Sequence, residues 1–188
     1  MNINPTYQYI TKQQVVEYAR NKIKESPVYL DTETTGLDFD DEIIELAIVD
    51  SDGKVIFDSF IKPYKSIPLS ATAINHISND MVRNAPTLAQ VWHEIQPILA
   101  TTSIGMYNAE FDIRMIMQTL KTNQIPDNTK FNAFDIMKVY TDFMGTDRRY
   151  KLEQAGRNLG IMIPNSHRAA DDTLLTRAVF HSIAGVQY

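Results

Sequence analysis

Hydrophobic residues recur along this chain with two different spacings, and each spacing predicts one kind of element. Residues 11–25 begin with a Thr-x-x-Gln capping box and continue with apolar side chains four positions apart, which predicts a helix. A Ser-Pro pair ends this helix, and Val28 to Leu30 then form a short buried strand. Residues 43–49 and 55–61 are rich in β-branched residues and flank an Asp-Ser-Asp-Gly turn, so we expect an antiparallel hairpin there.

From Pro68 onward the helical spacing dominates. Thr87 caps a helix whose apolar residues fall at i, i+3, i+4 and i+7 as far as Ile95, and a second such stripe runs from Ile113 to Leu120. Strands that come first, and then strands that alternate with helices, are typical of a mixed-sheet α/β domain. The remaining predicted elements are helices at about 136–144, 151–159 and 168–184 and short strands near 102–106 and 131–134.

The composition is that of an ordinary globular domain. The 188 residues, 44% hydrophobic and 22% charged, exclude disorder and collagen-like structure. We expect a single domain over 1–188, with a helical segment at 1–26 before a core at 27–188. The absence of cysteine excludes disulfides, thiolate nucleophiles and cysteine-ligated zinc. There is no signal-peptide pattern and no apolar run near the roughly 20 residues of a membrane span, so we expect a soluble cytoplasmic protein without a membrane partner.

Two acidic residues, Asp31 and Glu33, follow the buried residues of the first strand. Side chains two positions apart on a strand project to the same side, so we expect both carboxylates at the carboxyl end of the strand, where α/β sheets place their sites. Carboxylates held this close repel each other, so one must take up a proton or both must bind a cation. A solvated strand end is the alternative interpretation of this pair.

Further acidic residues and a histidine can join this pair. Asp112 lies in the first turn of a predicted helix, where it either complements the helix dipole or serves as a third ligand. His167 precedes the last helix. Asp171 would share the face of His167 if that residue were helical, whereas Asp172 serves as well if His167 lies on a loop. A surface-loop histidine is the plainer interpretation of His167 taken alone.

The ligand types indicate which metal could bind. Carboxylates without cysteine point to Mg²⁺ or Mn²⁺ and not to zinc. Several carboxylates can hold two such ions about 3.5–4 Å apart, one activating a water and the other stabilising the leaving oxygen of a phosphodiester. A histidine, which titrates near neutral pH, suits the removal of a proton from that water.

Three motifs resemble, in order, those of the DEDDh, or DnaQ-like, 3′–5′ exonuclease family, which includes the proofreading epsilon subunit of bacterial DNA polymerase III. Val28–Leu37 looks like the first exonuclease motif, Asn108–Asp112 like the second, and His167–Asp172 like the H-x-A-x-x-D third motif. The resemblance spans residues 28 to about 180, nearly the whole chain.

The resemblance implies a fold, a mechanism and a set of site residues. The fold is ribonuclease-H-like, an α/β five-stranded mixed sheet flanked by helices. His167 is the implied general base, and Asp172 is the implied fourth metal ligand beside Asp31, Glu33 and Asp112, with two Mg²⁺ or Mn²⁺ as cofactors. The residues implied to bind the 3′-terminal nucleotide or to lie near it are Thr34, Thr35, Gly36, Leu37, Asn75, His76, Asn108 and Phe111.

The chain departs from the family pattern close to these residues. Asn75 and His76 stand where the family usually has His-Gly, and Tyr107 stands where a histidine often precedes Asn-Ala. The departures leave the metal ligands intact and bear on substrate grip and on the choice between DNA and RNA. The chain also ends at Tyr188, without the C-terminal extension by which a proofreading subunit could hold a polymerase, so we expect a stand-alone or self-associating nuclease, such as a homodimer.

The expected activity follows from these motifs. We expect a metal-dependent 3′–5′ exonuclease that hydrolyses phosphodiester bonds at the 3′ end of single-stranded DNA and releases nucleoside 5′-monophosphates. The alternative is a 3′–5′ exoribonuclease that trims RNA tails or short oligoribonucleotides. A binding or scaffold protein that kept the fold without the activity is the third hypothesis.

The charge balance of 18 Lys+Arg against 23 Asp+Glu gives a net charge of −5, which by itself argues against a sequence-independent phosphate binder. The charge is uneven, however. Nine acidic residues and no basic residue lie between Asp31 and Asp52, whereas five basic residues and a single acidic one, Glu153, lie between Arg148 and Arg168. We expect metal ions to neutralise the first stretch and the second to form a positive surface for the strand backbone.

Overall fold

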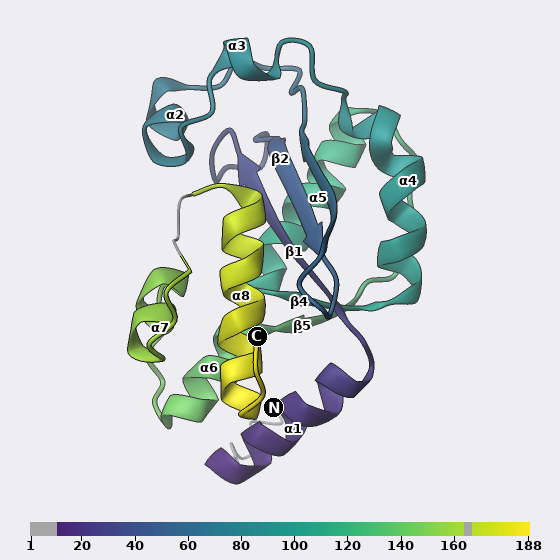
Figure 1. Ribbon diagram of the computed structural model, residues 1–188. Coiled ribbons are helices and arrows are strands. Elements are labelled where there is room, and N and C mark those ends of the chain that lie inside the picture. Colours follow the sequence, from purple (N-terminus) through teal and green to yellow (C-terminus); the bar gives the residue numbers. More distant parts are fainter. Residues whose placement is uncertain (1–10, 164–166) are drawn as a thin grey trace, which may run out of the picture.

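The computed structural model describes residues 11–163 and 167–188, which form a mixed five-stranded sheet with helices on both faces (Figure 1). The strand order is β3-β2-β1-β4-β5, in which β2 pairs antiparallel with β1 and β3, and β4 pairs parallel with β1 and β5. This topology confirms the predicted α/β architecture. The strands are β1 (Val28–Thr34), β2 (Ile43–Val49), β3 (Val55–Phe60), β4 (Ser103–Met106) and β5 (Asn132–Asp135).

The helices begin and end within a few residues of the positions that the apolar spacing predicted. Thr11 closes the predicted capping box with Gln14 at the start of α1, and the helical pattern after Pro68 resolves into two short helices, α2 and α3. The helices are α1 (Lys12–Lys24), α2 (Leu69–Asn75), α3 (Asn79–Val82), α4 (Leu88–Thr101), α5 (Ala109–Thr122), α6 (Ile136–Met144), α7 (Leu152–Asn158) and α8 (Ala169–Ala184).

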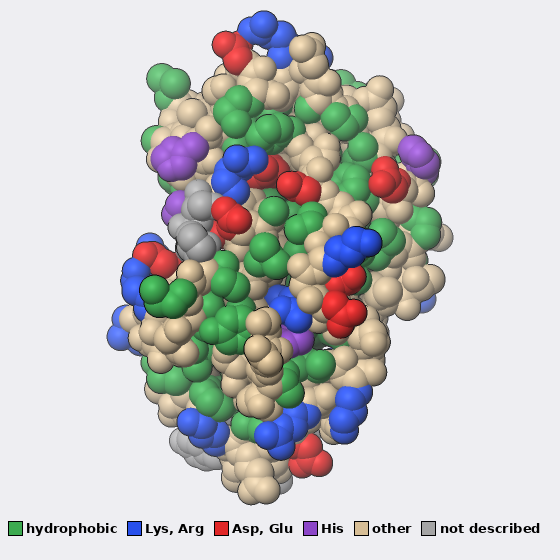
Figure 2. Space-filling model, in the orientation of Figure 1, with side chains coloured by type: hydrophobic (Ala, Val, Ile, Leu, Met, Phe, Trp, Pro, Cys, Tyr) green, Lys and Arg blue, Asp and Glu red, His purple; other side chains and the backbone are tan. Residues whose placement is uncertain are grey.

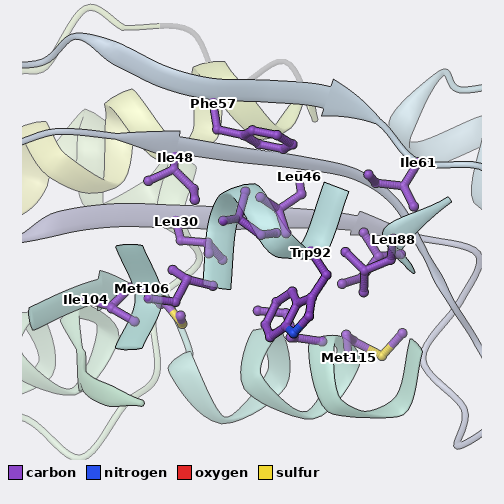
Figure 3. Close-up of a cluster of buried hydrophobic side chains, with 14 of the residues drawn as sticks. Leu30, Leu46, Ile48, Phe57, Ile61, Leu88, Trp92, Ile104, Met106 and Met115 are labelled. Carbon is purple, nitrogen blue, oxygen red and sulfur yellow. The ribbon is translucent and has the colours of Figure 1, made fainter. Parts of the chain in front are cut away.

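Each face of the sheet is buried under its own set of helices. Leu30 of β1 packs in one cluster with Trp92 of α4 and Met115 of α5 (Figure 3). Tyr29, on the opposite side of β1, packs in a second cluster with Phe180 of α8. Because both faces are covered, every residue of β2 is buried. The central strand β1 is therefore fixed between two packed layers, and the residues at its carboxyl end are fixed with it.

β1 extends farther than its apolar residues predicted. It runs to Thr34 because β2 continues to pair with it, through Glu33 opposite Glu45 and Thr34 opposite Ile43. The register shifts between Glu33 and Thr34. An irregularity of this kind bends a strand and changes the direction of its side chains. Asp31 and Glu33 are therefore part of the paired strand, and the loop begins after them.

The N-terminal helix α1 packs against α8 and α6. Val15 and Ala19 are buried there, and Arg20 Nε donates to the carbonyl oxygen of Ala184, 2.8 Å away, at the end of α8. The division of the domain near residue 27 stays a prediction. Among the helices in the described part of the chain, none combines the length and the apolar character needed to span a membrane.

Candidate active site

Three carboxylates meet at the carboxyl end of β1. Asp31 and Glu33 share one face of the strand, as their spacing predicted, and Asp172 reaches them from the first turn of α8. One carboxylate oxygen from each of the three lies within 4.8 Å of the other two. This separation suits ligands of a common cation, so the donor set and its geometry fit the hard divalent metal expected from the sequence.

Asp112 approaches β1 from α5. Asp112 is 2% exposed and accepts a hydrogen bond of 2.8 Å from the Thr32 hydroxyl. Thr32 lies between Asp31 and Glu33 in β1. Burial raises the pKa of Asp112 to about 7, against the lowering effect of the Thr32 hydrogen bond. Thr32 thus holds the carboxylate beside the strand that carries the cluster.

The electrostatic surroundings of the cluster favour the binding of a cation. Burial, followed by the charges of Asp112, Glu33 and Asp172, raises the pKa of Asp31 well above its usual range. Burial and the neighbouring carboxylates raise the pKa of Glu33 to about 8. Because a divalent ion favours the ionised forms, the cluster exchanges protons for metal when such an ion binds.

The third motif places a loop residue and a helix residue at one end of α8. His167 is exposed, has a φ of 52°, and precedes Arg168, the N-cap of α8. His167 is therefore not helical, and the argument that paired it with Asp171 on one helix face does not apply. Asp172 is 6% exposed and lies with Asp31 and Glu33, and its role as a metal ligand stays a prediction.

The loop after β1 is held by its own side chains. Thr34 Oγ1 donates to the Gly36 carbonyl at 2.7 Å, and Thr35 Oγ1 donates to Asp41 Oδ1 at 2.7 Å. Thr35 is 2% exposed, so its hydroxyl braces the loop from inside. Leu37 is 74% exposed at the loop surface, and its contact with a substrate base stays a prediction.

Asn75 and His76, the first departure from the family pattern, have different surroundings. Asn75 is buried; its side-chain amide nitrogen donates to the Thr34 carbonyl at 3.2 Å, and its side chain partly offsets the rise in the pKa of Glu33. His76 is exposed and has a φ of 61°, the left-handed conformation that glycine adopts most easily. This conformation explains why the family usually has glycine at this position, and it means that the backbone of His76 is strained.

The second motif begins with another left-handed residue. Asn108 has a φ of 73°, and its backbone N–H donates to Asp135 Oδ1 at 3.2 Å, which fixes the start of α5. Phe111 is partly exposed, with the guanidinium of Arg114 5.3 Å from its ring centre. The roles of Asn108 and Phe111 in substrate binding stay predictions.

Some residues of the site were missed from the sequence. Thr32 supports Asp112, and Glu45 lies opposite Glu33 in the register and pairs with Arg168. Glu45 did leave a signal, because it is the single charged residue in the otherwise apolar run Ile43–Val49. A charged side chain in a fully buried strand requires a partner.

Comparisons with known proteins agree with this geometry. The family model described as Exonuclease (RNase_T) matches residues 28–180. The chain is 31% identical to the uncharacterized exonuclease CP81 of Escherichia phage 186, over 93% of this chain and 96% of that protein. It is 30% identical to the DNA polymerase III subunit epsilon of Treponema pallidum, over 80% of this chain and 72% of that one. The structure of Exonuclease X in complex with 5′ overhanging duplex DNA is similar at 26% identity and a TM-score of 0.64, covering 84% of this chain and 90% of that one. The chain belongs to the DnaQ-like, DEDDh type of exonuclease, a family of nucleases that act on nucleic acids.

Proposed function

We propose that this exonuclease acts in the 3′–5′ direction on single-stranded DNA ends and releases nucleoside 5′-monophosphates. The observation that carries the proposal is the convergence of Asp31, Glu33 and Asp172, with oxygens within 4.8 Å of one another, beside the buried Asp112. The family depends on divalent metals, and this chain has a carboxylate cluster that can hold one.

The proposed roles are those that the family resemblance implies for the side chains at this end of β1. Two Mg²⁺ or Mn²⁺, when bound, supply an activated water and charge neutralisation at the leaving oxygen. Asp31, Glu33, Asp112 and Asp172 hold the ions. His167, exposed at the start of α8, takes the proton from the attacking water.

The substrate grip is proposed for the loop after β1. Leu37 packs against the terminal base, and the backbone of Thr34 to Gly36 lines the terminal sugar and phosphate. The internal hydrogen bonds of this loop support that role, because a braced loop loses little conformational freedom when a nucleotide binds.

The basic segment 148–151 is proposed to carry the strand backbone. Arg148, Arg149 and Lys151 are exposed, and the Tyr107 hydroxyl, at the second departure from the family pattern, donates to the Tyr150 carbonyl at 2.9 Å. This bond ties the basic segment to the residue directly before the second motif. The hydrogen bond supports the proposal because it holds the segment next to the start of the second motif.

Charge reversal tests this path. Arg148→Glu with Arg149→Glu should weaken oligonucleotide binding and reduce the slope of log K against log salt by about 0.7 for each phosphate that the variant no longer neutralises. The matched control is the reversal of Lys12 and Lys24, two exposed lysines of α1. An affinity and salt slope equal to those of the control would refute the proposed path.

Digestion of a labelled oligonucleotide tests the activity itself. With Mg²⁺ or Mn²⁺ the chain should shorten the strand from its 3′ end and release 5′-monophosphates, and EDTA should stop it. Asp31→Ala and His167→Ala should each lose several orders of magnitude because the site acts as a unit. Asp171→Asn is the matched control, one residue from Asp172, and should keep near-normal activity. Undiminished digestion in EDTA or in either site variant would overturn the mechanism.

The choice of DNA over RNA is supported by the similar Exonuclease X, whose structure was solved with duplex DNA. The alternative, trimming of RNA tails or short oligoribonucleotides, uses the same carboxylates, and the 2′-hydroxyl of the substrate is what distinguishes the two. Side-by-side hydrolysis of matched DNA and RNA oligonucleotides decides between them. Faster RNA hydrolysis would replace the DNA assignment and leave the rest of the proposal in place.

We propose that the chain is active alone or as a homodimer. Light scattering on the purified chain, with and without an oligonucleotide, measures which of these forms exists. A chain that turns over substrate only after a polymerase is added would contradict this part of the proposal.

A further inference from the structure

Glu45 and Arg168 form an ion pair that joins β2 to the third motif, with the carboxylate buried and the guanidinium partly exposed. Glu45 is 2% exposed in β2. Arg168 Nε donates to both carboxylate oxygens of Glu45, at 3.0 and 3.1 Å, and Arg168 Nη2 donates to Glu45 Oε1 at 2.6 Å. The Ala169 amide donates to Oε2 at 2.9 Å. Such a forked contact fixes both the distance and the orientation of the guanidinium.

The two ends of this pair lie beside different parts of the proposed site. Glu45 stands directly opposite Glu33 in the pairing of β1 with β2. Arg168 follows His167 immediately, and Ala169 is the first residue of α8, three positions before Asp172. The Glu45 carboxylate thus fixes Arg168, which directly follows His167, and the start of α8, the helix that carries Asp172. Figure 2 shows acidic and basic side chains side by side over this end of α8.

His167 needs support of this kind. Its side chain is exposed, so packing does not hold the ring, and its φ of 52° is unfavourable for a residue other than glycine. The surrounding structure must therefore impose its backbone conformation. Arg168 is anchored on a second side as well, since its guanidinium lies 5.0 Å from the ring centre of Phe60 in β3.

We propose that Glu45 and Arg168 are positioning residues for His167. They touch no reacting atom and act by fixing residues 167–172 against β2. This inference rests on the proposed general-base role of His167.

Steady-state kinetics at saturating Mn²⁺ test the proposal. Arg168→Gln and Glu45→Gln should lower kcat about 10- to 100-fold with little change in KM, because a misplaced general base slows the chemical step and not substrate binding. Arg168→Lys keeps the charge without the fork and should recover only part of the activity.

A double-mutant cycle separates positioning from general support of the fold. If Arg168 acts through His167, adding Arg168→Gln to His167→Ala should cost about 2-fold or less beyond His167→Ala alone. A full additional loss in that background would overturn the inference.

Amide hydrogen exchange gives a readout that does not need turnover. Glu45→Gln should speed exchange at Ala169–Asp172, because a neutral amide accepts the Ala169 hydrogen bond more weakly than a carboxylate does. The matched control is Glu42→Gln, another buried carboxylate, which accepts hydrogen bonds from the amides of Tyr64 and Lys65. That variant should speed exchange near 64–65 and leave 169–172 unchanged.

The two experiments distinguish the two proposals. Unchanged exchange at 169–172 in Glu45→Gln would overturn the positioning role whether or not the chain is active. Faster exchange in that variant, together with a wild-type chain that hydrolyses nothing, would refute the proposed activity and the catalytic part of this inference, while the anchoring role of Glu45 itself would stand.

Discussion

Without metal, the protein should lose stability as the pH rises from about 5 to 8, and Glu33→Gln should remove part of that loss. Burial, with the charges of Asp172, Glu45 and Asp112, raises the pKa of Glu33 from 4.5 in the unfolded chain to about 8 in the folded one. Between these values the folded state holds a proton that the unfolded chain has released. The free energy of unfolding therefore falls as the pH rises through this window.

The magnitude follows from the slope for a single proton. At about 1.4 kcal/mol per pH unit, Glu33 alone lowers the free energy of unfolding by about 2.5 kcal/mol between pH 5.5 and 7.5. For a domain of this size that corresponds to a fall of roughly 5–10 °C in Tm. Asp31 and Asp112, whose pKa values are also raised, act in the same direction.

One group acts in the opposite direction. Burial lowers the pKa of His181, so the folded state holds fewer protons there than the unfolded chain, and stability is lost as the pH falls. Because His181 is present in the wild type and in Glu33→Gln alike, its contribution cancels in the difference between the two proteins.

The assay is thermal unfolding in EDTA at pH 5.5 and 7.5 for the wild type, Glu33→Gln and the exposed-site control Glu17→Gln. The wild type and the control should lose clearly more Tm over this interval than Glu33→Gln does. Added Mg²⁺ or Mn²⁺ should raise the wild-type Tm more at pH 7.5, because ligands bind metal in their deprotonated forms. An equal loss of Tm in all three proteins would refute the electrostatic account of the cluster.

Three substitutions test the surroundings of the site. Gly105→Ala would place a Cβ 2.9 Å from the Tyr29 ring, and we expect a loss of about 1–3 kcal/mol in urea unfolding, whereas an unchanged midpoint would contradict the packing. Gly36→Ala would drive a Cβ into the Asp41 carboxylate, so kcat/KM should fall as the loop shifts, and full activity would show that the loop tolerates the displacement. Leu37→Ala should raise KM about 5- to 10-fold while the unfolding free energy stays unchanged, because the side chain is 74% exposed; an unaltered KM would remove Leu37 from the proposed substrate site.

The fold could be predicted largely because both faces of its sheet are buried by amphipathic helices. The apolar spacing located the helices, and the β-branched runs located β2 and β3. The extension of β1 to Thr34 could not be found this way, because its last four residues are polar or charged. Their strand conformation comes from pairing with β2, a contact distant in sequence, and not from any local preference.

The site was predictable to the extent that local geometry determines it. The period of a strand brings Asp31 and Glu33 to one face, and this needed no further information. Spacing alone left Asp171 and Asp172 open, because the choice depends on the backbone at His167, and only the family resemblance implied Asp172. In the structure His167 has a left-handed backbone, so it does not share a helix face with Asp171. The supporting ion pair of Glu45 joins segments more than a hundred residues apart, which spacing along the chain cannot reveal.

The structure also changes the meaning of the acidic stretch between residues 31 and 52. Some of its carboxylates form ion pairs within the chain: Lys65 Nζ lies 2.8 Å from Asp41 Oδ1, and Glu45 pairs with Arg168. Asp31 and Glu33 instead have raised pKa values, because burial and neighbouring carboxylates oppose their ionisation. Asp31 and Glu33 would therefore carry their full negative charge only with a cation bound beside them. Two divalent cations there would favour the ionised carboxylates, bring the formal net charge of −5 to about −1, and offer positive charge to a phosphodiester at this end of β1.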